Sequence, residues 1–280
     1  MVPSTGGVAA AAYDLGGEGP DVLLVHATGF CAAVWAPMAD LLDGCRVVAL
    51  DVRGHGRASI PEHGMEWSGT ADDVLAVVDH FGLDRPVGLG HSMGGAALLL
   101  AEQARPGTFA GLWVFEPIVM PEWYVLQGAG GGDGSNPLAD GARRRRSTFP
   151  SAEDAFANFA AKPPMMLLAP EALAAYVTYG FEPQSDGSVT LRCRPEVEAA
   201  NYEMGARHDG FAHLGEVTCP VVVLKGSDRV PGPAGFAADI ADALPSGVLE
   251  DHPELYHFGP LEDPAAMASS ALRFVRTTTT

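Results

Sequence analysis

Basic side chains are scarce in this sequence. Its 280 residues include 17 Lys and Arg against 35 Asp and Glu, so the formal net charge is −18. This balance excludes a nucleic-acid-binding role, because phosphate recognition needs clustered Lys and Arg, and it disfavours docking on an anionic membrane. The one basic run, Arg143 to Arg146, is expected to be solvated, because four adjacent side chains point in different directions.

Cysteine is also sparse, and long apolar runs are missing. The four cysteines contain no C-x-x-C pair, so neither a zinc site nor a disulfide framework is indicated, and reduced, buried thiols are expected. Residues 1–17 have no basic start followed by an apolar core. We therefore expect no signal peptide, no membrane span and a cytoplasmic protein, while homo-oligomers remain possible.

Hydrophobic residues, in contrast, make up 47% of the chain and recur in an ordered way. Short apolar runs alternate with helical patterns, which predicts an α/β fold with a mostly parallel sheet and helices on both faces. The expected strands cover 21–26, 45–51, 86–90, 110–115, 219–225 and 247–250, and the expected helices 35–42, 70–81, 93–103, 236–244 and 263–275. The alternation stops between 121 and 207, although helical patterns recur at 152–161 and 170–179. We therefore predict a core domain (1–120 and 208–280) with an insertion (121–207).

The strongest chemical signal is the run Gly90-His91-Ser92-Met93-Gly94. It matches G-x-S-x-G between a predicted strand and a predicted helix, which is the setting of a nucleophile elbow. The tight turn would lift the Ser92 hydroxyl above the carboxyl ends of the strands, and the helix N-terminus would favour developing negative charge. Ser92 is therefore the predicted nucleophile.

Two further turns follow predicted strands. The turn His26-Ala27-Thr28-Gly29-Phe30 can supply a backbone N–H, so we expect the N–H groups of Thr28 and Met93 to form an oxyanion hole. His26 and the polar residues of the second turn, Asp51, Arg53 and His55, are interpreted as braces of these loops. The general base is expected late in the chain, where His257 is preferred to His252 and His213.

Together these motifs, with His257 ahead of Leu261-Glu262-Asp263-Pro264, resemble the α/β-hydrolase superfamily over nearly the whole chain. The resemblance implies the α/β-hydrolase fold and makes the insertion a helical cap over the active site. Most members carry the triad aspartate after the strand at 221–224, where Asp228 is available in a short loop. Glu116 instead ends the strand after the nucleophile helix, as in haloalkane dehalogenases and zearalenone lactonases. The acid is one of Glu116 and Asp228, with a slight preference for Glu116.

The resemblance implies a serine hydrolase that cleaves a carboxylic ester or lactone through an acyl-enzyme, without a metal or organic cofactor. Dehalogenase and epoxide hydrolase chemistry is disfavoured, because both need a carboxylate at position 92. A thioesterase, a carbon–carbon bond hydrolase, a cofactor-free perhydrolase and a non-catalytic binding protein remain alternatives. A hydrophobic small-molecule substrate is expected from apolar residues of the insertion: Trp123, Tyr124, Phe156, Phe159, Met165, Met166, Leu167 and Tyr176.

Overall fold

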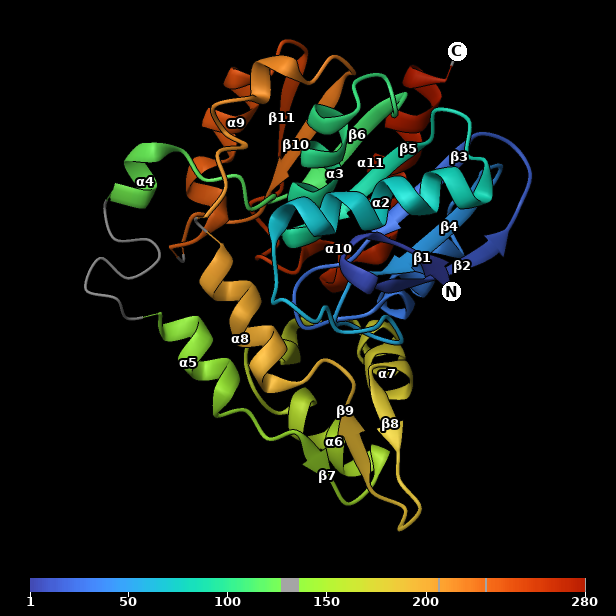
Figure 1. Ribbon diagram of the computed structural model, residues 1–280, viewed down its shortest axis with the longest axis vertical. Helices are drawn as coiled ribbons and strands as arrows, with labels where there is room; N and C mark the ends of the chain where they lie inside the picture. Colours follow the sequence, from blue (N-terminus) through green and yellow to red (C-terminus); the bar gives the residue numbers. More distant parts are fainter. Residues whose placement is uncertain (127–135, 206, 230, 280) are drawn as a thin grey trace.

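The computed structural model describes residues 1–126, 136–205, 207–229 and 231–279. An eight-stranded sheet with the strand order β1-β2-β4-β3-β5-β6-β10-β11 forms its centre (Figure 1). Pairs involving β2 are antiparallel, and all other pairs are parallel, as predicted. The strands are β1 Val2–Pro3, β2 Ala9–Gly16, β3 Asp21–Val25, β4 Arg46–Asp51, β5 Val87–His91, β6 Gly111–Phe115, β10 Val221–Lys225 and β11 Gly247–Asp251.

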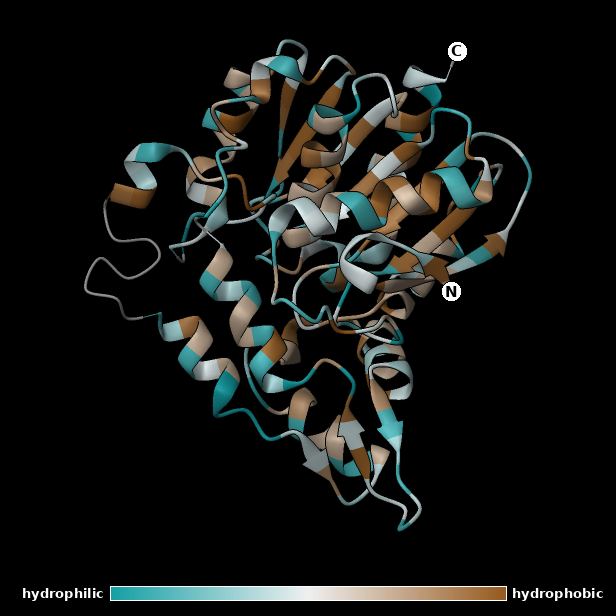
Figure 2. Cartoon of the chain, in the orientation of Figure 1, coloured by the Kyte–Doolittle hydropathy of each residue, from teal (hydrophilic) through white to brown (hydrophobic). Residues whose placement is uncertain are grey.

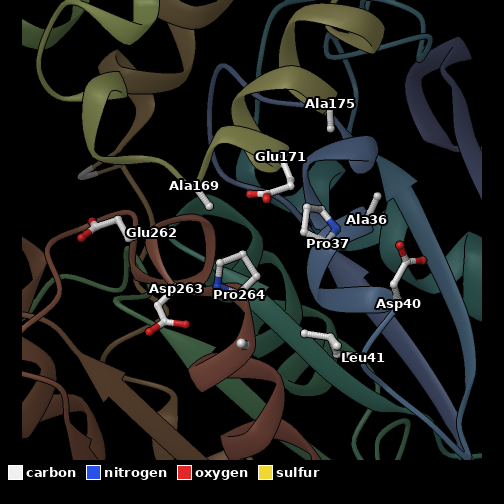
Figure 3. Close-up of a pocket in the computed structure, with 11 residues that line it drawn as sticks. Ala36, Pro37, Asp40, Leu41, Ala169, Glu171, Ala175, Glu262, Asp263 and Pro264 are labelled. Carbon is white, nitrogen blue, oxygen red and sulfur yellow. The ribbon is translucent and has the colours of Figure 1, made fainter.

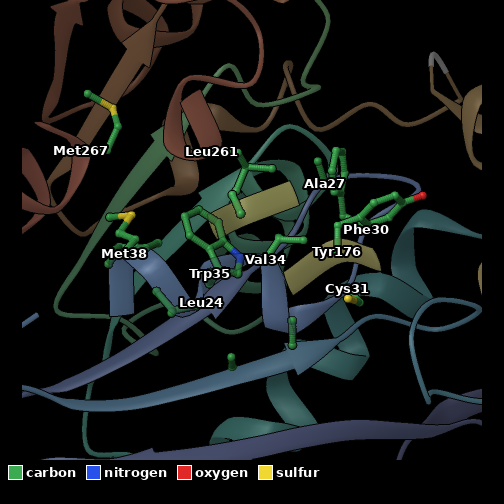
Figure 4. Packing of buried hydrophobic residues seen from close by; sticks show 14 of the residues in the cluster. Leu24, Ala27, Phe30, Cys31, Val34, Trp35, Met38, Tyr176, Leu261 and Met267 are labelled. Carbon is green, nitrogen blue, oxygen red and sulfur yellow. The ribbon is translucent and has the colours of Figure 1, made fainter. Parts of the chain in front are cut away.

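Helices cover both faces of this sheet, so the predicted fold class is confirmed. Along β3, Val22 and Leu24 enter one hydrophobic cluster and Leu23 and Val25 the other, because successive strand side chains point to opposite faces. The first cluster surrounds Trp35 (Figure 4). The first cluster takes side chains from α1 Ala36–Ala39, α6 Ala152–Ala160, α7 Pro170–Tyr179, α10 Gly259–Glu262 and α11 Pro264–Thr278. The second takes them from α2 Trp67–Phe81, α3 Met93–Ala104 and α9 Ala237–Ala243. Figure 2 shows the apolar character of the central strands.

The chain between β6 and β10 leaves the main sheet. It contains five α-helices and a three-stranded antiparallel sheet with the order β7-β9-β8 among the described residues. The elements are α4 Glu122–Leu126, α5 Pro137–Arg143, β7 Thr148–Phe149, α6 Ala152–Ala160, α7 Pro170–Tyr179, β8 Phe181–Pro183, β9 Val189–Leu191 and α8 Pro195–Met204. The predicted helical insertion therefore also contains a small sheet that the sequence analysis did not predict, and its limits at 121 and 207 stay a prediction.

Helix α8 packs on the two turns that follow β3 and β4. A Cβ added to Gly29 would lie 3.0 Å from Oε1 of Glu198, and one added to Gly54 would lie 2.6 Å from Val197. The inserted segment (residues 121–207) thus contacts the edge of the sheet where Ser92 is expected.

Two smaller expectations concern the whole chain. All four cysteines are unpaired and buried, as predicted. No helix in the part of the chain that the structure describes has both the length and the apolar character needed to cross a membrane.

Candidate active site

Ser92 occupies a strained turn between β5 and α3. Its backbone has φ 55° and ψ −114°, in the left-handed range that a non-glycine residue adopts at a cost of roughly 1–3 kcal/mol. The Ser92 N–H donates to the carbonyl of Phe115, at 2.9 Å, so the neighbouring strand helps to hold this geometry. Strain of this kind is concentrated at functional sites, where the surrounding fold compensates for it.

The glycines around Ser92 are required by close backbone packing. A Cβ on Gly90 would lie 2.7 Å from the Cα of Gly95, and a Cβ on Gly94 only 2.1 Å from the carbonyl oxygen of Val25. The start of α3 therefore rests directly against the end of β3, which brings the elbow beside the turn that follows β3.

The structure brings Ser92, His257 and Glu116 together, although they are far apart in the sequence. His257 Nε2 lies 3.2 Å from Oγ of Ser92, and His257 Nδ1 lies 2.6 Å from Oε2 of Glu116. The imidazole thus stands between a hydroxyl and a carboxylate, as it must to move a proton from one nitrogen while the other stays hydrogen-bonded.

Glu116 is held as firmly as Ser92. It follows β6 with a positive φ of 44°, and its N–H donates to the carbonyl of Leu224 at 2.8 Å. Its side chain is buried, and its second oxygen, Oε1, accepts the N–H of Gly226 at 2.8 Å. Both carboxylate oxygens are therefore engaged, which fixes the face that Glu116 presents to His257.

The other candidates lie elsewhere. Asp228 has a side chain that is 61% exposed, and it accepts a hydrogen bond from Nζ of Lys225 at 2.5 Å. His213 and His252 pair with acidic neighbours in their own segments. The structure thus places Glu116 rather than Asp228 against His257, while the catalytic roles themselves remain predictions.

Two residues that the sequence analysis missed hold the main chain of His257. His91, inside the elbow motif, donates from Nε2 to the His257 carbonyl at 2.6 Å. Glu262 accepts the N–H groups on either side of His257, from Tyr256 at 3.0 Å and Phe258 at 3.1 Å. Burial lowers the pKa of His91 well below its usual value, so its ring is neutral near pH 7. The available signals were the positions of His91 in the elbow motif and of Glu262 in the run that follows His257.

The predicted oxyanion donors lie on adjacent elements. Met93 is the first residue of α3, where N–H groups have no partner within the helix. Thr28 is half-buried in the turn after β3, against which Gly94 is packed. The assignment of these two N–H groups stays a prediction.

The polar residues of the turns brace the loops, as interpreted. His26 donates from Nδ1 to its own turn and accepts the N–H of Val52 at Nε2, at 3.2 Å. Asp51 accepts two main-chain N–H groups, and Arg53 pairs with Asp73 through two nitrogens, at 2.9 and 2.7 Å. These contacts join the loops that follow β3 and β4.

The apolar residues expected to line a pocket are largely engaged within the inserted segment or exposed. Phe159 and Tyr176 pack on each other and on Phe181, with ring centroids 5.6 to 6.1 Å apart. Trp123 and Met166 are more than 40% exposed. A surface hollow beside α1, α7 and α11 has an acidic rim (Figure 3). Ser92, Glu116 and His257 are not among the residues that line it. Glu262 lines this hollow and also accepts main-chain N–H groups of the His257 loop.

Known proteins show the same arrangement at the level of the fold. The alpha/beta hydrolase family model matches residues 22–270. Protein phosphatase methylesterase 1 of Bos taurus is 34% identical over 151 residues, which cover 51% of this chain and 37% of that protein. The crystal structure of E-2-(acetamidomethylene)succinate hydrolase has a TM-score of 0.79 at 22% identity and covers 96% of both chains. A thermophilic esterase from Thermogutta terrifontis has a TM-score of 0.73 at 24% identity and covers 100% of this chain and 97% of its own.

Proposed function

Since the chain belongs to the alpha/beta hydrolase family and is a hydrolase, we propose that it cleaves a carboxylic ester or lactone of a small molecule through an acyl-enzyme on Ser92. The observation that carries the proposal is the pair of contacts made by His257, 3.2 Å to Ser92 and 2.6 Å to Glu116. A serine–imidazole distance near the long end of the hydrogen-bonding range is common before substrate binds.

In the proposed reaction, His257 Nε2 takes the Ser92 proton while Oγ attacks the substrate carbonyl. The resulting oxyanion would accept hydrogen bonds from the N–H groups of Thr28 and Met93. The imidazolium then protonates the leaving alcohol, and the neutral imidazole that results accepts a proton from the water that releases the acid. Throughout, Glu116 keeps the Nδ1–H tautomer and stabilises the cation.

The test is turnover of a simple aryl ester by purified variants. Ser92→Ala and His257→Ala should each lose nearly all turnover, and the double variant should lose hardly more, because triad members act as a unit. Full wild-type turnover in Ser92→Ala would refute the proposal. Assays of the wild type for thioester hydrolysis and for peracid formation distinguish the thioesterase and perhydrolase reactions, which the same three residues could also catalyse.

A further inference from the structure

The arginine run of the inserted segment is not uniformly solvated, contrary to expectation. Arg143, Arg144 and Arg146 are exposed, but the side chain of Arg145 is only 19% exposed. Arg145 forms an ion pair with Glu198 of α8 and donates from Nη2 to the Tyr176 hydroxyl at 2.6 Å. Its guanidinium is therefore held in a fixed place by two buried groups.

The Arg145 guanidinium lies beside the turn after β3, which carries Thr28, a predicted donor of the oxyanion hole. A Cβ on Gly29 would lie 3.0 Å from Glu198 Oε1 and 3.4 Å from Arg145 Nη1. Aromatic rings connect the same region to the base: Tyr176 packs on Phe30 at 5.2 Å, Phe30 on Phe258 at 5.5 Å, and Phe258 on His257 at 5.4 Å. The inserted segment thus presents to this turn both an ion pair and the ring of Tyr176, which also packs on Phe159 and Phe181.

The guanidinium has hydrogen-bonding capacity left. Arg has five N–H donors in a planar fork that matches a carboxylate, and the structure assigns one bond to Glu198 and one to Tyr176. In a chain with a net charge of −18, an anionic substrate needs such a local cation.

We propose that Arg145 binds a carboxylate of the substrate, so that the preferred ester or lactone carries a free acid group. This inference rests on the proposed hydrolase function. Glu198 and Tyr176 act as positioning residues, because they orient the guanidinium without contacting the reacting atoms.

The test compares two aryl esters with equal chains, para-nitrophenyl hexanoate and the para-nitrophenyl monoester of adipic acid, by kcat/KM after subtraction of spontaneous hydrolysis. The wild type should prefer the anionic ester. Arg145→Gln should lower the anionic-to-neutral ratio about 10- to 100-fold, the size of a lost charge-assisted hydrogen bond. Glu198→Gln should raise the ratio, because the cation loses its counter-charge. The matched control is Arg146→Gln, an exposed neighbour over the ring of Phe149, which should leave the ratio unchanged.

Thermal unfolding of each variant checks that the variant is folded. Should Arg145→Gln fail to fold because Glu198 is left unpaired, the double variant Arg145→Gln/Glu198→Gln removes both charges and must show the same fall in ratio. An unchanged ratio in a folded variant without Arg145 overturns the inference while leaving the hydrolase function intact. A wild type that turns over neither ester contradicts the proposed function and, with it, this inference.

Discussion

At the scale of single residues, backbone geometry decides which carboxylate meets the imidazole. Glu116 adopts a positive φ and hydrogen-bonds across to β10, which turns its side chain toward His257. Asp228 lies in the solvent beside Lys225. Nothing in the composition of the two loops indicates this difference, which is why the sequence left both carboxylates open.

Glu116→Gln and Asp228→Asn should therefore behave very differently. The amide at position 116 would favour the wrong imidazole tautomer and leave the imidazolium unstabilised, so kcat should fall by roughly 10⁴, the precedent for such a change in a serine protease triad. Asp228→Asn should stay near the wild-type value. Steady-state kinetics with an aryl ester measures both, and the reverse pattern would assign the acid to Asp228.

Glu262 offers a second test at this scale. Its carboxylate accepts N–H groups on both sides of His257, so Glu262→Gln, which retains one acceptor oxygen, should lower kcat about tenfold through loss of one such bond. KM should change less than kcat. Asp263→Asn is the control, because Asp263 loses the same charge but caps α11 through Ala266. Equal effects of both substitutions would argue against a positioning role for Glu262.

At the scale of elements, the close contact of α3 with β3 builds the site. The sequence predicted this strand–turn–helix unit well, because apolar runs and glycines mark its ends. It gave no sign of the strands β1 and β2, since Ala9–Gly16 is rich in alanine, a residue with little preference for strands. The sheet within the inserted segment was missed because its strands have only two or three residues.

Substitutions at two glycines in helices measure the effect of close packing separately from the effect of helix propensity. Gly94→Ala would drive a methyl group onto the Val25 carbonyl, so both the free energy of unfolding and the turnover should fall. Among the described residues, none lies within 4 Å of a Cβ added to Gly141 in α5, and Gly141→Ala should stabilise the protein by about 0.5–1 kcal/mol. Urea unfolding measures both changes, and a stable, active Gly94→Ala protein would contradict the packing of the elbow.

At the scale of the whole molecule, buried histidines link stability to pH. Burial lowers the pKa values of His26 and His55 to about 4, below their ordinary 6.5. Between these values the unfolded chain binds protons that the folded chain does not, so stability is fully present above pH 6.5 and is lost as the pH falls toward 4. Each histidine contributes a slope of up to about 1.4 kcal/mol per pH unit.

Urea unfolding at pH 7 and pH 5.5 measures this slope. His55→Gln should show a smaller difference between the two pH values than the wild type. The exposed His80 provides the control, since His80→Gln should keep the wild-type slope. A stability that does not change over this range would mean that these histidines are protonated in the folded protein.

The central claim concerns one atom, Oγ of Ser92, and its reactivity is measurable without knowledge of the natural substrate. An alkyl fluorophosphonate should phosphonylate the wild-type protein once per chain with loss of fluoride, and mass spectrometry of its peptides should place the adduct on Ser92. His257→Ala should react far more slowly, because the hydroxyl loses its base. An adduct on another residue, or equal labelling of Ser92→Ala, would contradict the account.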